Sequence, residues 1–195
     1  LVAEYLEFMG QMRGLKGLKT RREMAENDPY ISAGLLTIKQ FLRQTTITVT
    51  PGGTDAAAQR SAELAETSLA DMSATWADTL SDILTVLHYG WAYHEVVLKA
   101  RKGETDDPTT NSKYSDGLWG WRKIETRAQE TLDKWAFDDH GGVQGMWQCP
   151  PNGGERRLIP IDRSLLFRTE PNRGNPEGRS LLRGAYLPWY HAKRI

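Results

Sequence analysis

The spacing of apolar residues changes along this 195-residue chain, and the change limits the folds that it can adopt. Before Gly90 the apolar residues recur every three to four positions, which is typical of amphipathic helices. From Trp91 to Thr169 they recur at every second position in short runs, which is typical of strands. A last helical stretch follows. This order predicts an α+β fold, in which long amphipathic helices pack on an antiparallel β-meander.

Two complete helices are predicted before Gly90. The first begins at Asp28-Pro29, because aspartate can cap free amides and proline has no N–H to leave unpaired. The second covers residues 55–89, with Asp55 as its cap and with Gly90 suited to a left-handed C-terminus. Between them, residues 45–50 are all β-branched and alternate, so they predict a strand.

The segments at either end are predicted from their helix breakers. Residues 1–9 have helical spacing that stops at Gly10, and residues 10–27 are basic and interrupted by glycines, which indicates a loop or an extended arm. Near the other end, Asn175 and Pro176 predict the start of a final helix, which Pro188 should end or kink.

The block of strands is separated by turn-forming residues. A polar stretch, residues 101–117, predicts an exposed hairpin loop, and Asp139–Gly142 and Asn152–Glu155 predict tight turns. The strands are expected at residues 91–99, 119–126, 132–138, 143–148, 157–161 and 165–169.

Composition excludes several classes of protein. No apolar run approaches the roughly 20 residues that a membrane span needs. Seven Trp, seven Tyr and four Phe exclude wholesale disorder. Cys149 is the only cysteine, so the chain has no internal disulfide and no cysteine-based zinc site. Since the chain begins at Leu1 and stops within a predicted helix, we expect it to be a segment of a longer polypeptide.

No catalytic, cofactor-binding or metal-binding residue can be assigned from the motifs. The four histidines lack metal-ligand spacing, and adjacent His94 and Glu95 would point to opposite faces of a strand. Ser180 lacks the second glycine of a nucleophile elbow, and Cys149 has no partner histidine nearby in sequence. The Gly-rich stretch at residues 172–179 contains Pro176, which removes an amide that a phosphate cradle needs.

Charges are segregated although the net charge is zero. Residues 54–82 carry six acidic residues against Arg60 alone, whereas residues 156–195 carry nine basic residues against three acidic ones. This pattern indicates either an anionic partner, self-association between unlike faces, or simply solvated surface. The clustered aromatic residues between Trp91 and Tyr190 could stack on nucleic-acid bases, but in alternating strands they more often form a core.

Several runs of residues resemble a known family. They are DPYISA at 28–33, LHYGWAYHEVV at 87–97, WAFD at 135–138, LIPIDR at 158–163, LFR at 166–168 and GNPEGRSLLRGAY at 174–186. Together they resemble the portal proteins of tailed bacteriophages, particularly the Mu-like branch, over most of residues 28–195. The second and last of these runs are the most specific, and neither is a catalytic signature.

The resemblance implies a structural, non-enzymatic subunit of a head–tail connector. Such subunits form a ring, usually of about twelve copies, at the capsid vertex through which DNA is packaged and ejected. The implied partners are further copies of the chain, the major capsid protein, the packaging terminase, head-completion or tail adaptor proteins, and double-stranded DNA that passes without sequence-specific recognition. No membrane partner or cofactor is implied. The implied location is the virion, after assembly in the host cytoplasm.

The resemblance also suggests how the chain is divided. Residues 1–27 would be a helix end and a basic arm, residues 28–170 a wing-like α+β domain, and residues 171–195 a loop and helix leading toward the stem. The stem, clip and crown would lie after Ile195.

In a head-to-tail ring, the acidic helix of one subunit could face the basic C-terminal section of the next. The interface candidates are Asp71, Asp78, Asp82, Arg179, Arg183, Lys193 and Arg194. Three alternatives stay open: another head component such as a minor capsid or adaptor protein, a nucleic-acid-binding module, or an enzyme domain whose catalytic half lies outside this sequence.

Overall fold

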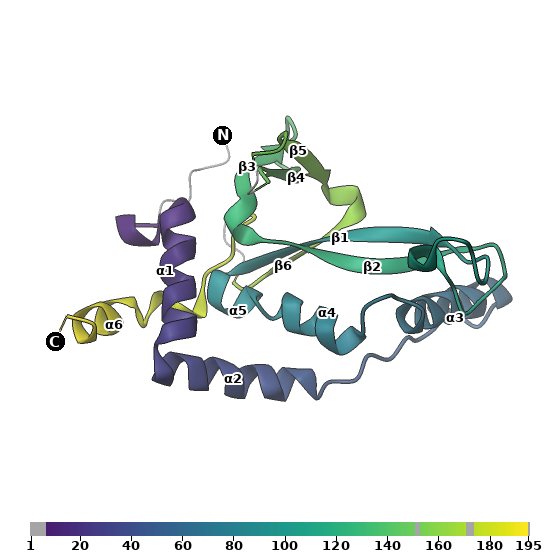
Figure 1. The fold of residues 1–195 in the computed structure, drawn as a ribbon, viewed down its shortest axis with the longest axis horizontal. Helices are drawn as coiled ribbons and strands as arrows, with labels where there is room; N and C mark the ends of the chain where they lie inside the picture. Colours follow the sequence, from purple (N-terminus) through teal and green to yellow (C-terminus); the bar gives the residue numbers. More distant parts are fainter. Residues whose placement is uncertain (1–6, 151–152, 171–173, 195) are drawn as a thin grey trace.

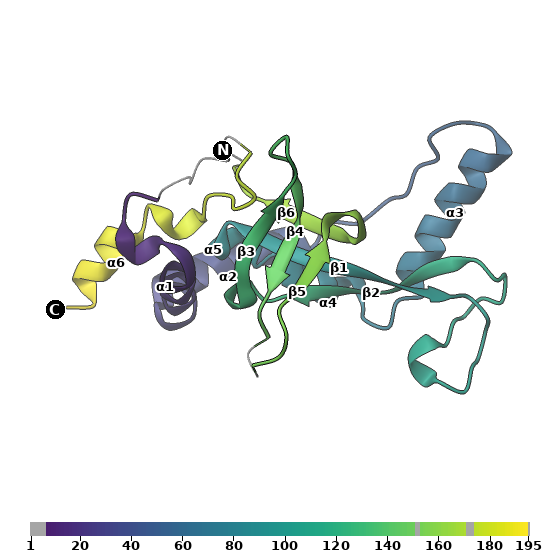
Figure 2. The same ribbon diagram turned by 90° about the horizontal axis from the view of Figure 1, so that it is seen from above.

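A computed structural model describes residues 7–150, 153–170 and 174–194. Figure 1 shows an elongated molecule, with α1 and α6 at one end, α3 at the other and a sheet between them. A second sheet lies above the first in this view, and α2 and α4 lie below it. Figure 2, seen from above, shows α3 projecting away from the rest of the chain.

The described helices are α1 Gly14–Asn27, α2 Pro29–Arg43, α3 Ala56–Ala70, α4 Trp76–Ile83, α5 Val86–Tyr89 and α6 Tyr186–Ala192. Short 3₁₀ turns are η1 Gly10–Met12, η2 Pro108–Thr110, η3 Gln129–Thr131, η4 Ile161–Arg163 and η5 Leu181–Arg183. The predicted caps of α2 and α3 are confirmed, because Asp28 and Asp55 each accept two backbone N–H groups at the helix start. Gly90 ends α5 with φ 96°, a left-handed conformation that favours glycine.

Two three-stranded antiparallel sheets contain all the strands in the described part of the chain. Their strands are β1 Trp91–Ala100, β2 Trp119–Arg127, β3 Leu132–Phe137, β4 Val143–Gln148, β5 Arg157–Pro160 and β6 Ser164–Arg168. The first sheet has the order β2-β1-β6, and the second is the simple meander β3-β4-β5. The α+β prediction is therefore confirmed, although β6 returns to pair with β1 rather than extending the meander.

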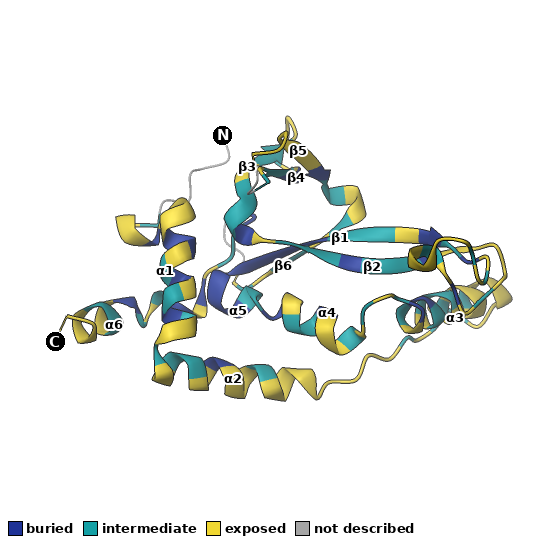
Figure 3. Cartoon of the chain, in the orientation of Figure 1, coloured by how far each residue is buried: buried dark blue, intermediate teal, exposed yellow. Residues whose placement is uncertain are grey.

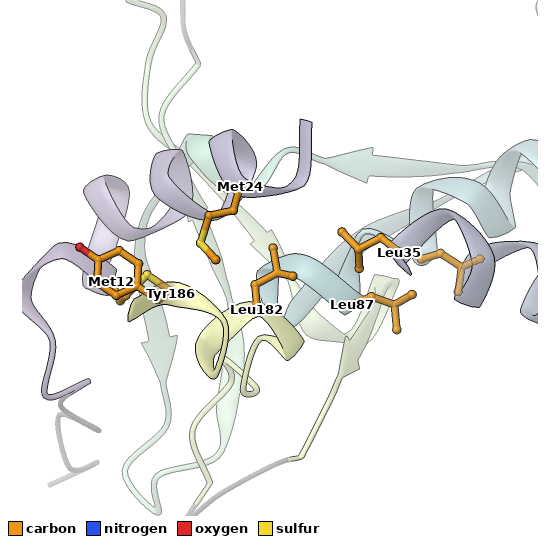
Figure 4. Packing of buried hydrophobic residues seen from close by; sticks show 7 residues of the cluster. Met12, Met24, Leu35, Leu87, Leu182 and Tyr186 are labelled. Carbon is orange, nitrogen blue, oxygen red and sulfur yellow. The ribbon is translucent and has the colours of Figure 1, made fainter. Parts of the chain in front are cut away.

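Two hydrophobic clusters form the core. The first joins α1, α2 and α5 to the C-terminal segment through Met12, Met24, Leu35, Leu84, Leu87, Leu182 and Tyr186. Figure 4 shows Met24 and Leu182 pointing toward each other across this junction. The second cluster joins the two sheets through Trp91, Tyr93, Met146 and Ile159. Figure 3 shows the buried positions concentrated around these clusters, with α3 and its neighbouring loop largely exposed.

The aromatic residues were expected to form a sheet core, and the structure confirms this for part of the set. Trp91 and Tyr93 are fully buried, and Trp135 meets both rings edge-on at centroid distances of 5.1 and 5.7 Å. Trp119 is an exception, because it is 66% exposed near the distal end of the first sheet.

The predicted loop over residues 10–27 is wrong, because α1 occupies most of it. Leu18, Arg21 and Met24 are buried on one face of α1, and the basic residue in that face hides the helical pattern. Gly17 does not interrupt α1. A Cβ at Gly17 would lie 2.1 Å from the carbonyl oxygen of Met12, so glycine permits the close approach of η1. Most of the helix end predicted over residues 1–9 lies outside the described residues, and residues 7–9 are not helical.

The single helix predicted over residues 55–89 is also wrong, because it is divided into α3, α4 and α5. Asp71 ends α3, and Ser73 then donates its N–H to the carbonyl oxygen of Arg122 on β2, at 2.8 Å. Thr75 begins α4 by accepting the N–H of Asp78. Contacts with a distant strand therefore overrode the helical periodicity.

Two further predictions are wrong. Residues 45–50 are irregular and are paired with no strand of the described chain. The last helix does not begin at Asn175. That side chain instead accepts the N–H of Glu177 in a turn, and α6 begins only at Tyr186. Pro188 lies in the first turn of α6, where a missing N–H costs nothing, so it neither ends nor kinks the helix.

Candidate subunit-contact surfaces

The end of the molecule that contains α3 is held together mainly by polar contacts. We call α3, residues 101–118 and the adjoining ends of β1 and β2 the distal arm. Lys99 on β1 reaches Asp71 at the end of α3, with 3.1 Å between Nζ and Oδ2. Both side chains are almost completely buried, with 4% and 2% exposed. Neither hydrophobic cluster includes a residue of α3.

Asp71 is surrounded by donors. The Ser112 hydroxyl donates to Oδ2 at 2.7 Å, and the backbone N–H of Lys113 donates to Oδ1 at 2.8 Å. Burial acts to raise the pKa of Asp71, but these two hydrogen bonds and the Lys99 ammonium outweigh it and lower the pKa overall. The carboxylate therefore stays charged, and its contacts are all within the chain.

Arg101 forms a second link within the arm. Its guanidinium bonds Asp116 at 2.8 Å and donates to the Thr67 hydroxyl of α3 at 2.9 Å. The same group lies 4.0 Å from the centroid of the Tyr114 ring, which adds a cation–π contact. The Arg101 side chain, which directly follows β1, thus connects α3 to the loop.

The other two acidic candidates lie on the surface of α4. Asp78 is exposed and accepts a hydrogen bond from the Thr75 hydroxyl at 2.6 Å. Asp82 is also exposed and accepts one from the Thr126 hydroxyl at 2.9 Å. Neither carboxylate is in a salt bridge with a described residue. They share one helix, whereas Asp71 lies apart in the arm.

The basic candidates lie near the opposite end and already contact acidic or aromatic groups of the same chain. Arg183 is 2.6 Å from Glu7, Arg179 is 3.7 Å from Glu170, and Lys193 pairs with Glu23. Arg194 stacks over Tyr190, with 4.1 Å between its guanidinium carbon and the ring centroid. Sequence reasoning missed Glu7 and Glu23 as partners, because more than 160 residues separate each of them from the basic residue that it contacts, Arg183 or Lys193.

A cleft of about 490 Å³ lies between α1, α2, α5 and η3. Lys39 lines it without an ion pair to any described residue, and burial lowers the pKa of Lys39. His88 also lines the cleft, and burial, followed by the nearby charge of Lys39, lowers the pKa of His88 to about 4 despite the opposing charge of Glu130. Burial raises the pKa of Tyr89, and so does the hydrogen bond that its hydroxyl donates to Glu130 at 2.7 Å. Tyr89 and Glu130 are thus joined by a hydrogen bond within the cleft.

The four histidines are not gathered into a site. His94 is fully buried beside Phe167, and its Nδ1 is 3.3 Å from the Thr126 hydroxyl. Within the described residues, no group of three His, Cys, Asp or Glu side chains is placed to hold a metal ion. In the same residues, no helix is both long enough and apolar enough to span a membrane.

Two groups of exposed apolar side chains lie on α2 and at the tip of the first sheet. Tyr30 and Phe41 on α2 are 87% and 70% exposed. Leu98, Leu118 and Trp119 form a smaller exposed group at the tip of the first sheet. Contiguous exposed apolar surface is a feature of sites that contact another protein. The sequence offered a signal for α2, since apolar residues lie on more than the one helical face that its core needs.

Comparison with known families finds a match over most of the chain rather than at a single site. A family model described as the portal protein of Mu bacteriophage matches residues 18–194. The match begins within α1 and includes both sheets and α6. No curated protein matches the chain.

Proposed function

This chain belongs to the family of Mu bacteriophage portal proteins, and we propose that it forms part of a ring at one vertex of the phage head. Portal proteins are structural components of the virion. The ring would be the route by which the DNA genome is packaged and later ejected. The observation that carries this proposal is the family match over residues 18–194.

The surfaces of the molecule support assembly into a larger structure. Heterologous, head-to-tail contacts require two different surfaces on each subunit, and they close into a ring when the rotation between subunits permits. The chain offers unlike surfaces, since α3 and α4 expose acidic residues and α2 exposes apolar ones. We keep Asp78 and Asp82 as interface candidates, together with the exposed Arg179, Lys193 and Arg194. Asp71 is a weaker candidate, because its carboxylate is buried within the arm.

We propose that residues 28–170 form a wing-like domain and that residues 171–195 lead toward a stem. Within the described residues, α1 packs against α2, α5 and η5, so residues before 28 contribute to the same body. The proposed partners are the major capsid protein, the packaging terminase and head-completion or tail adaptor proteins. DNA would pass without sequence-specific contacts, since phosphate contacts from scattered basic residues carry no sequence information. We also propose that the ring is assembled in the host cytoplasm.

The mass of the full-length protein in solution, together with negative-stain images, tests the proposal. We expect rings with a central hole, and the family implies about a dozen subunits in each ring. A protein that stays monomeric across concentrations and in the presence of its scaffold would contradict ring formation. DNA binding by that monomer, falling steeply as salt is raised, would favour a nucleic-acid-binding module instead.

A further inference from the structure

The segment between α2 and α3 has a sequence suited to a strand but no strand to pair with. Residues 45–50 read Thr-Thr-Ile-Thr-Val-Thr, so every side chain is β-branched and apolar residues alternate with threonines. In Figure 1 the segment runs from α2 toward α3 along the lower edge of the molecule. It is irregular, and all of its residues except Val49 are exposed.

The backbone of this segment is largely unpaired. The N–H of Thr45 bonds the carbonyl oxygen of Leu42 at 3.2 Å and closes the end of α2. From Thr46 to Thr50, no backbone hydrogen bond to a described residue is formed. Ile47 is 44% exposed. The side chains of this segment therefore favour a strand, whereas its backbone in the monomer is irregular. Pairing with another chain would let the segment form the strand that its sequence favours.

The two sheets present four edges, of which β6 fits the segment best. Pro160 in β5 has no N–H to donate, and the outer edge of β2 already accepts a hydrogen bond from Ser73. β3 carries adjacent exposed charges at Asp133 and Lys134, which disfavour added strands. β6 lies at the edge of the first sheet, and its Leu165 is 39% exposed.

We propose that residues 45–50 of one copy add as a strand to the β6 edge of a second copy. Main-chain hydrogen bonds would supply the attraction, and Ile47 and Val49 would pack beside Leu165 and its neighbours. The segment and β6 are different surfaces, so the contact is heterologous and can repeat around a ring. This inference rests on the proposed ring and names one of the contacts that would close it.

Hydrogen exchange of the full-length protein, compared between its monomeric and assembled states, tests the proposal. We expect residues 45–50 to exchange rapidly in the monomer and to become protected together with residues 164–168 on assembly. Rings in which 45–50 stay unprotected would contradict strand addition while leaving the ring itself intact. Protection at another sheet edge would contradict the choice of β6. A protein that never assembles would contradict both the ring and the contact.

Proline substitutions test whether the backbone itself makes the contact. Neighbouring N–H groups of a strand point to opposite sides, so either Ile47→Pro or Thr48→Pro must remove a hydrogen bond to the partner. We expect at least one of them to raise the concentration needed for assembly by about tenfold or more. The monomer should keep its helical signal and melting temperature, because these residues form no backbone ladder within it.

Ile47→Thr is the matched control, because it keeps both the N–H group and a β-branched side chain. It should assemble much closer to the original protein than Ile47→Pro does. Equal loss in Ile47→Thr and Ile47→Pro would show a side-chain contact and would overturn strand addition. Normal assembly of both proline variants would overturn it as well.

Discussion

The proximal body and the distal arm bury different kinds of side chain. In the proximal body, which comprises α1, α2, α5 and the C-terminal segment, Met24, Leu87 and Tyr186 share one apolar cluster. In the distal arm, Lys99 and Asp71 form a nearly buried ion pair. Apolar packing tolerates small rearrangements, whereas a buried charge is stable only while its partner stays in place. The comparison predicts that the arm depends on a few specific contacts and that the body depends on many shared ones.

The largest expected effect comes from removing one partner of the buried pair. Asp71→Ala leaves the Lys99 ammonium buried without a counter-charge, which costs about 3–5 kcal/mol. We expect the arm to open before the body does, so hydrogen exchange should accelerate in α3 and residues 101–118 while α1 keeps its protection. Glu66→Ala, an exposed acid on the same helix, should change little. Uniform loss of protection along the chain would show that arm and body unfold as one unit.

Creating a cavity in the proximal body by substitution tests the other half of the comparison. Met24 is fully buried, and Met24→Ala removes apolar contacts between α1 and the C-terminal segment, at a cost of about 2–5 kcal/mol. Denaturant unfolding should show a lower midpoint for the signal from the body, including the Trp189 environment near the cluster. The control is Leu15→Ala, since Leu15 lies on the same helix and is 49% exposed. If both variants lost the same stability, the cluster around Met24 would not be what holds the body together.

Acid should weaken the parts that contain buried histidines before it weakens the arm. Burial lowers the pKa of both His88 and His94 to about 4, partly opposed by Glu130 and Asp82 respectively. Each histidine is neutral when folded and gains a proton on unfolding, so its contribution is full above about pH 6.5 and is lost as pH falls toward 4. Each could remove about 3 kcal/mol at pH 4. Asp71, with its pKa lowered below 3.8, loses its contribution only in more acidic solution.

Unfolding free energies measured between pH 7 and pH 4 check this order. The slope should flatten in His88→Gln and in His94→Gln, whereas the exposed His140→Gln should keep it. A profile that stays flat down to pH 4 in the original protein would contradict the assignment. Loss of protection in the arm before the body, over the same range, would contradict the comparison.

Local sequence signals predicted the caps and the period change but not the long-range polar contacts. Asp28, Asp55 and Gly90 each act within a few residues, so their roles follow from neighbours in the sequence. Asp71 was read as a helix-surface acid because its partner Lys99 lies 28 residues away. Arg21 concealed α1 for a related reason, since its guanidinium donates to the carbonyl oxygen of Met12 and is buried. Tertiary contacts of charged side chains leave no periodic signal.

The interface candidates stay a prediction, and the structure shows only where their side chains lie. Charge segregation pointed to Asp78 and Asp82, and both are exposed on α4. It could not show that Arg183 and Lys193 already meet Glu7 and Glu23, because those pairs depend on the chain ends coming together. The family, by contrast, was recognisable from runs of residues on both sides of the strand block, and the match over residues 18–194 confirms it.

The smallest expected effect concerns the joint between the two regions, where α4 begins. The Thr75 hydroxyl accepts the N–H of Asp78 at 3.1 Å and satisfies one of the free amides at the helix start. Thr75→Ala should cost about 1 kcal/mol, and Thr75→Ser should restore most of it.

Ser61→Ala on α3 is the control for this prediction. It also removes one hydroxyl hydrogen bond, to the carbonyl oxygen of Ala57, but it leaves no amide unpaired and should change stability much less. Because α4 lies in the sequence between α3 of the arm and α5 of the body, hydrogen exchange can show which region loses stability. Faster exchange in α3 alone would place the joint in the arm, whereas faster exchange in α5 would place it in the body. No change in either region, with an unchanged unfolding midpoint, would mean that the cap is dispensable and that the contact between Ser73 and β2 sets the start of α4.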